Sequence, residues 1–135
     1  VTRDAFPDAR DLARFIAASV RLGVAFKATA GLHHPIRAEY RLTYDAHADV
    51  GPMFGFLNVF VATALARAGM PAAELVEVLD ERDAGAFVFG RDEVSWRGHR
   101  AGADVVADAR RHGVTSFGSC SFREPVDDLE TLGLL

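Results

Sequence analysis

The sequence predicts an α/β protein whose order of elements resembles the C-terminal portion of a β/α (TIM-like) barrel. Two short strand patterns, at residues 24–31 and 114–117, each follow an amphipathic helical pattern. Reactive side chains come directly after both strands, as they do at the carboxyl ends of barrel strands. Half of the 135 residues are hydrophobic, so we expect one α/β domain over residues 1–135 with a core of its own.

The first helix is expected from Asp8 to Val20, where apolar residues recur at helical spacing. Pro7 suits its first turn, and Gly23 lies just beyond its end. The strand at 24–31 then begins after this single glycine. A helix and a strand joined so closely form the αβ half of a βαβ unit.

The two faces of the strand at 24–31 differ in chemistry. Alternation places Phe26 and Ala28 on one face, and Lys27 and Thr29 on the other. Parallel strands of a βαβ unit normally have both faces covered. We therefore expect Lys27 and Thr29 to point into a covered space.

The middle of the chain combines a long polar connection with two helices. Residues 31–52 are read as a loop, and loops of this length in compact domains are usually functional or disordered. A helix apolar almost all round is expected over 53–68, with Asn58 as its polar exception, and a second helix over 71–81.

The last third of the chain returns to strands. A small β-hairpin at about 86–97 reads as an insertion, and a helix over 101–112 leads into the strand at 114–117. Pro125 opens a last short helix. Two parallel strands do not make a stable covered sheet, so we expect either a homo-oligomer or a missing N-terminal segment to complete it. The start at Val1 favours a partial chain, although an alternative start codon or a removed leader would give the same sequence.

Composition narrows the class of partner. The net charge is −4, and the sequence has no basic block, which argues against nucleic acid and anionic membranes as partners. No apolar run is long enough to span a bilayer, and no leader pattern is seen, so a cytoplasmic location is expected. A small-molecule substrate fits best, and no cofactor is predicted.

Lys27 is the only lysine beside fourteen arginines. Arginine is the cation everywhere else in the chain, so a catalytic role could explain the one lysine, whose compact ammonium has a pKa that falls on burial. Such an amine could form a Schiff base with a carbonyl substrate. Thr29 shares its face and could orient it. The alternatives are a lysine paired with a carboxylate or an anion, and an arginine bias that left one lysine by chance.

His33 and His34 follow the first strand, where either could act as general acid or base. Adjacent residues in an extended chain point opposite ways, so we expect one of them to face the site and not both to bind one metal. A metal would need further ligands, for which His47, Asp45 and Cys120 are candidates, but no tight ligand spacing is present. Two histidines bonded to loop backbone are the alternative.

The turn Gly118-Ser119-Cys120-Ser121 follows the second strand, and its small residues let backbone amides approach a ligand. Acidic residues in the helix that follows argue against a phosphate, so a neutral or carbonyl ligand is expected. Cys120 is either a nucleophile activated by a histidine or a buried structural thiol. The expected substrate-binding residues are Thr29, Arg37, Asn58, Ser119 and Ser121, although Asn58 fits equally well as a core amide bonded to backbone.

Three motifs resemble the C-terminal part of an uncharacterised family of bacterial proteins. They are Phe26-Lys27-Ala28-Thr29-Ala30-Gly31-Leu32-His33-His34-Pro35, Gly55-Phe56-Leu57-Asn58-Val59 and Ser116-Phe117-Gly118-Ser119-Cys120-Ser121-Phe122-Arg123-Glu124-Pro125. The resemblance implies a site but no particular reaction. The Lys-x-Thr-x-Gly core is also similar to the Schiff-base strand of class I deoxyribose-phosphate aldolases, which implies a β/α barrel and a nucleophilic lysine. The paired histidines and the acidic last helix depart from that pattern.

The sequence thus favours a small-molecule enzyme of the lyase or aldolase type, acting on a carbonyl compound. In this hypothesis Lys27, His33, His34 and Cys120 are the catalytic candidates. A metal-assisted hydrolase with histidine and cysteine ligands is one alternative. A non-catalytic module that depends on a partner is the other.

Overall fold

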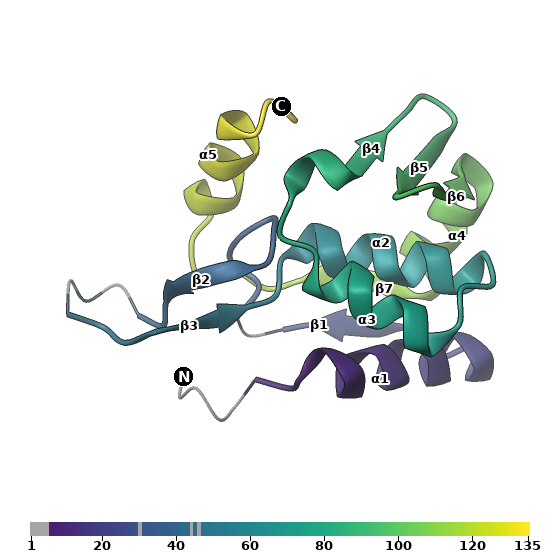
Figure 1. Cartoon of the computed structure of the whole chain (residues 1–135), viewed down its shortest axis with the longest axis horizontal. Coiled ribbons are helices and arrows are strands. Elements are labelled where there is room, and N and C mark those ends of the chain that lie inside the picture. Colours follow the sequence, from purple (N-terminus) through teal and green to yellow (C-terminus); the bar gives the residue numbers. More distant parts are fainter. Residues whose placement is uncertain (1–5, 30, 44, 46) are drawn as a thin grey trace.

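The computed structural model describes residues 6–29, 31–43, 45 and 47–135. The predicted mixture of helices and strands is confirmed (Figure 1). In chain order the elements are α1 (Ala9–Leu22), β1 (Phe26–Ala28), β2 (Ala38–Arg41), β3 (Val50–Met53), α2 (Phe56–Arg67), α3 (Ala72–Asp80), the 3-10 turn η2 (Ala84–Ala86), β4 (Phe87–Phe89), β5 (Glu93–Trp96), β6 (His99–Gly102), α4 (Ala103–His112), β7 (Val114–Phe117) and α5 (Arg123–Thr131). No helix among the described residues has the length and apolar character needed to cross a membrane.

Helix α1 is set by a capping residue at each end. The Asp8 side chain accepts a hydrogen bond from the Asp11 backbone N–H (2.7 Å), and Gly23 closes the helix with φ 66°. The sequence had suggested that Pro7 lies in the first turn, but Pro7 precedes the capping residue Asp8. Only glycine adopts this left-handed conformation without a steric cost, which is why the helix ends where it does.

Helix α2 is the centre of the fold. It contacts α1, α3, α4 and the strands β5, β6 and β7, and most of its residues are buried. The all-round apolar pattern at 53–68 predicted such a helix, and the helix does end just before Gly69. Its first turn is held by the preceding loop, since the backbone N–H of Phe56 donates to the carbonyl of His34 (2.9 Å).

Strands β1 and β7 pair in parallel, as their positions in the sequence predicted. Phe26 lies opposite Val114 and Lys27 opposite Ser116, and no third strand joins them within the described ranges. Strand β1 lies within the predicted range 24–31, and Phe26, Lys27 and Ala28 are the residues that pair with β7. The ladder brings the two segments that follow these strands together.

One face of this small sheet is uncovered. Phe26 is half-buried, and Val114 is fully buried against the helices, whereas Lys27, Thr29 and Thr115 are exposed. The expectation that Lys27 and Thr29 point into a covered space is therefore wrong. No helix or strand of the described chain packs over this face, so the usual burial of a parallel sheet does not apply.

Two further sheets lie in regions where the sequence predicted a loop and a two-stranded hairpin. Residues 31–52 contain the antiparallel pair β2–β3, and the predicted hairpin has a third strand, β6. A two-residue turn, Arg97-Gly98, joins β5 to β6 with φ 43° and φ 87°, as a tight hairpin turn requires. The three-stranded sheet β4–β5–β6 packs on α2 and α4 and contributes Trp96 to the core.

Candidate functional site

The histidine cluster lies where the segments after β1 and β7 meet the start of α5. Strand β1 leads into the loop that carries both histidines, and β7 leads into the turn at 118–121. Figure 1 shows α5 above β2, and the Tyr40 ring of β2 stacks on His34, so this strand also contributes to the cluster. We define the histidine cluster as His33, His34, Tyr40, Ser119, Glu124 and Asp128.

His33 faces the serine of the turn. Its Nδ1 lies 3.2 Å from the Ser119 Oγ and 3.4 Å from the backbone N of Cys120. A backbone N–H can only donate, so the network assigns Nδ1 as an acceptor and, in the neutral ring, places the proton on Nε2. The Ser119 hydroxyl can then donate to the same nitrogen, which is the geometry of a hydroxyl in contact with a base.

His34 is held by carboxylates from α5. Its Nδ1 lies 2.7 Å from the Asp128 Oδ2, and its Nε2 lies 3.8 Å from the Glu124 Oε1. A carboxylate accepts, so Nδ1 of His34 carries a proton, the opposite of His33. The ring also stacks on Tyr40 with centroids 3.5 Å apart. His34 is therefore fixed on both edges and on one face.

The two histidines do not point in opposite directions. Their ring centroids are 6.5 Å apart, and Glu124 lies 3.8 Å from a ring nitrogen of each. An extended backbone would point the two rings in opposite directions, but the chain bends from His34 to Ile36. Both rings consequently lie near Glu124 of α5, so the expectation that they point in opposite directions was wrong.

Tyr40 supports the cluster from β2. Its hydroxyl donates to the carbonyl of Ile36 (2.8 Å). Burial raises the pKa of the Tyr40 phenol, and the Asp128 carboxylate raises it further. Tyr40 thus stays neutral and acts as a stacking and hydrogen-bonding support.

The turn after β7 is braced by its own hydroxyls. The backbone N–H of Ser121 donates to the Ser119 Oγ (3.3 Å), and that of Glu124 donates to the Ser121 Oγ (3.1 Å). Ser121, expected to bind substrate, therefore satisfies a donor at the start of α5. The Ser119 hydroxyl also lies within hydrogen-bonding distance of His33. Cys120 is exposed and is not the buried thiol considered as one alternative.

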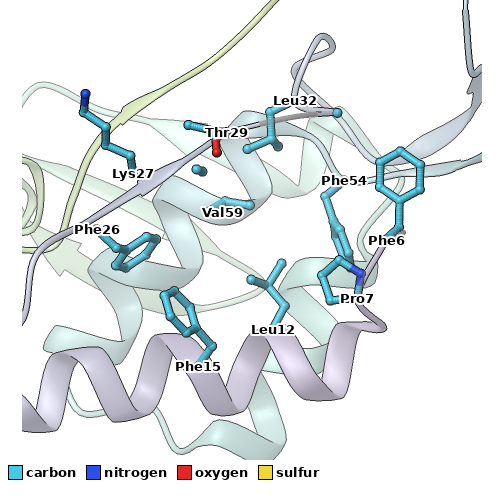
Figure 2. A pocket seen from close by; sticks show the side chains of 12 residues that line it. Phe6, Pro7, Leu12, Phe15, Phe26, Lys27, Thr29, Leu32, Phe54 and Val59 are labelled. Atoms are coloured by element: carbon cyan, nitrogen blue, oxygen red, sulfur yellow. The ribbon is translucent and has the colours of Figure 1, made fainter. Parts of the chain in front are cut away.

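Lys27 and Thr29 lie beside a different hollow. A cavity of about 180 Å³ between α1 and β1 is lined mainly by apolar side chains. Figure 2 shows Phe15, Phe26 and Leu12 turned into this space, while the Lys27 amine points away from them. Lys27 forms no hydrogen bond or ion pair with any residue described, so its ammonium is free in solvent.

Arg37 and Asn58 have structural partners. Nε of Arg37 lies 2.8 Å from the Asp80 Oδ1, and its guanidinium stacks on Phe54 at 4.2 Å. Burial lowers the Arg37 pKa, an effect that Asp80 opposes. Asn58 is fully buried and bonds backbone groups only, one of the two roles the sequence left open.

Two of the three residues proposed as further metal ligands, Asp45 and His47, lie apart from the cluster. Asp45 and His47 are exposed in the β2–β3 connection, where the His47 backbone N–H donates to the Asp45 Oδ1 (2.8 Å). This connection extends away from α5 (Figure 1). Across the described residues, no group of three or more histidine, cysteine or acidic side chains has an arrangement that could hold a metal ion.

Sequence reasoning missed Tyr40, Glu124 and Asp128. The two acidic residues are four apart on α5 and share one face of the helix, which was the available signal. From the sequence, these two side chains indicated only that a phosphate would be repelled. Their pairing with the histidines became visible only when α5 was placed against the loop after β1.

Comparisons with known proteins give no further guide. No protein-family model, curated protein or solved structure matches this chain at a significant level.

Proposed function

We propose that the chain is a small-molecule enzyme that acts on a carbonyl compound at the histidine cluster, with His33 as the base and Ser119 as the nucleophile. The observation that carries this proposal is the 3.2 Å approach of the Ser119 Oγ to Nδ1 of His33, at the carboxyl ends of two parallel strands. A hydroxyl becomes an effective nucleophile when an adjacent base takes its proton. Strand ends of this kind are where β/α enzymes hold their catalytic groups.

The chemistry needs only groups that the cluster contains. The Ser119 oxygen forms a bond to the carbonyl carbon, the π electrons of the carbonyl move onto its oxygen, and the Ser119 proton moves to Nδ1 of His33. Glu124 lies 3.8 Å from that nitrogen and can stabilise the resulting imidazolium. Because Glu124 approaches the same nitrogen as Ser119, it balances charge and does not orient the ring as the acid of a Ser-His-Asp triad does.

A serine-directed probe tests this assignment without a known substrate. A small fluorophosphonate is expected to label Ser119, and His33→Gln is expected to slow labelling by about 100-fold or more, because the base is lost. Intact mass followed by peptide mapping measures the rate and the position. Ser95→Ala is the matched control, since Ser95 is a half-buried serine on β5, outside the cluster.

Two results would count against the assignment. One is the absence of any adduct at Ser119 after prolonged exposure. The other is labelling of Ser119 at the same rate in the wild type and in His33→Gln, which would show that His33 does not activate the hydroxyl.

Lys27 supports a second candidate, a lyase that forms a Schiff base with its substrate. The observation that favours it is an unpaired primary amine on β1, one residue before the end of the strand. Exposure removes the desolvation that would activate the amine, so this candidate ranks below the serine reaction.

Borohydride reduction in the presence of a panel of small aldehydes and ketones tests the lyase. If Lys27 is catalytic, at least one compound should trap on it about tenfold faster or more than on the N-terminal amine, and Lys27→Arg should abolish that adduct while preserving the charge. Peptide mapping separates the two amines. Equal trapping on both, for every compound, would identify Lys27 as an ordinary surface amine.

A further inference from the structure

A second cavity, of about 330 Å³, lies on the opposite side of α2 from α1. Its walls come from α2, α4, β7 and the hairpin strands β4 and β5. Neither histidine of the cluster, nor Ser119, nor Lys27 lines it. The cavity is therefore separate from the site proposed above, and what it binds is a separate question.

We propose that this cavity binds a small aromatic monocarboxylate, with the ring against Phe56, Phe60 and Phe117 and the carboxylate at Arg110.

Four of the lining side chains are phenylalanines, at positions 56, 60, 89 and 117. Phe56 and Phe117 stack with centroids 4.4 Å apart, and Phe60 meets Phe117 edge-on at 6.1 Å. Exposed faces and edges of such a group pair favourably with a further flat ring. Phe89, which is 46% exposed on β4, extends this apolar wall to the surface.

The size of the cavity limits the ligand. A cavity of about 150 Å³ in another protein accepts benzene, so 330 Å³ has room for about two fused rings. This volume lies at the lower end of the range for small-molecule pockets. A two-ring compound therefore matches the volume of the cavity.

Arg110 supplies the charge that the ligand must match. It is the one charged side chain in the lining, it is exposed, and it forms no ion pair with any residue in the described ranges. Arg67, which reaches α4 from α2, already forms an ion pair with Asp108. A planar guanidinium at the mouth of an apolar cavity matches a carboxylate, which it can bind through two parallel hydrogen bonds.

A matched pair of probes tests the proposal. Calorimetry and backbone amide NMR shifts would compare 2-naphthoate with its neutral analogue 2-naphthylmethanol. We expect the wild type to bind naphthoate about fivefold more tightly, and Arg110→Gln to remove this preference without changing the affinity for the alcohol. Because the contribution is electrostatic and partly exposed, high salt should reduce the preference.

Two further variants separate the cavity from the rest of the surface. Arg111→Gln removes the same charge from the next residue of α4, which does not line the cavity, and it should leave the preference intact. Val106→Phe fills the cavity from α4 and should weaken both probes by about tenfold or more.

Several outcomes would overturn the proposal. They are no binding of either probe at the solubility limit, equal affinity of the wild type for both probes, and an equal effect of Arg110→Gln and Arg111→Gln. Amide shifts confined to the histidine cluster would place the ligand elsewhere and overturn it as well.

Discussion

Replacing Glu81 with alanine is expected to lower the free energy of unfolding by about 3 to 5 kcal/mol, the largest effect of any single substitution considered. The buried Glu81 carboxylate accepts from Trp96 Nε1 (3.0 Å), Arg97 Nε (2.6 Å) and the backbone N–H groups of Arg82 (3.1 Å) and Asp83 (3.0 Å). It thus joins the end of α3 to the turn between β5 and β6. Alanine leaves all four donors without their acceptor. Urea unfolding followed by far-UV circular dichroism measures the loss.

The same carboxylate gives the stability a defined pH dependence. The folded pKa of Glu81 is lowered from 4.5 to about 2, chiefly by the hydrogen bond from Arg97, while burial opposes the shift and the hydrogen bonds from the Asp83 backbone and Trp96 favour it. A lowered pKa stabilises the fold above the unfolded value, and that contribution is lost as the pH falls from about 4.5 to about 2. We expect about 2 to 3 kcal/mol from this group, discounted because Arg97 is largely exposed.

The control for this pH effect is Glu77→Gln, which alters an exposed carboxylate on α3. It should retain the loss of stability between pH 4.5 and 2, whereas Glu81→Gln should lack most of it. If wild type and Glu81→Gln lose stability in parallel over that interval, Glu81 is not the titrating group.

Asn58→Leu is expected to cost about 2 to 4 kcal/mol, although leucine has a similar volume and suits a helix. The Asn58 Oδ1 accepts from the backbone N–H of Arg37 (2.9 Å), and Nδ2 donates to the carbonyls of Val78 (2.9 Å) and Glu81 (2.8 Å). Leucine would leave the Arg37 N–H and the Glu81 carbonyl without these partners, and the Val78 carbonyl with only the backbone N–H of Glu81 (3.4 Å). Equilibrium unfolding in urea provides the measurement.

A second substitution and a control sharpen the interpretation. Asn58→Asp should be more damaging near neutral pH, because its carboxylate would face the two carbonyls that now accept hydrogen bonds. Thr63→Val, another fully buried polar site on α2, should cost only about 1 kcal/mol, because its hydroxyl bonds the carbonyl of Val59 in the same helix. An Asn58→Leu variant as stable as Thr63→Val would contradict the role assigned to the amide.

Local signals in the sequence were sufficient for much of the fold. Helix α1 follows from Asp8, which caps it, and Gly23, which ends it. Helix α2 follows from a long apolar run that ends near Gly69, and the pairing of β1 with β7 follows from their positions after helices. The two helices depend on residues close together in the chain, whereas the pairing follows from a repeated order of helix and strand.

The strands that were missed depend on less typical residues. Strand β3 contains Pro52, which cannot donate to a ladder and argues against a strand in a short polar segment. Strand β6 follows the turn Arg97-Gly98, in which arginine occupies a left-handed position usually taken by asparagine or glycine. The Arg97 guanidinium bonds to Glu81, a contact that no local pattern predicts.

The candidate site was predictable only in outline. That the residues after β1 and β7 would meet follows from parallel pairing, and His33 does meet Ser119. The exposure of Lys27 could not be predicted, because the burial of a side chain on the sheet depends on what packs over that face. The roles of Arg37 and Asn58 likewise depend on Asp80, Phe54 and the end of α3, all distant from them in the sequence.

The short parallel ladder has a consequence for how long the site persists. Strand β1 has three residues, and it pairs with a strand about two thirds of the chain length away, with Phe26 opposite Val114. Closing so long a loop for so few hydrogen bonds is costly in entropy, so this pairing should form late in folding and open before the helical core does. Each opening would separate His33 from Ser119 while α1, α2 and α3 stay packed. The lifetime of the assembled site is then set by a local opening of the ladder and not by global unfolding.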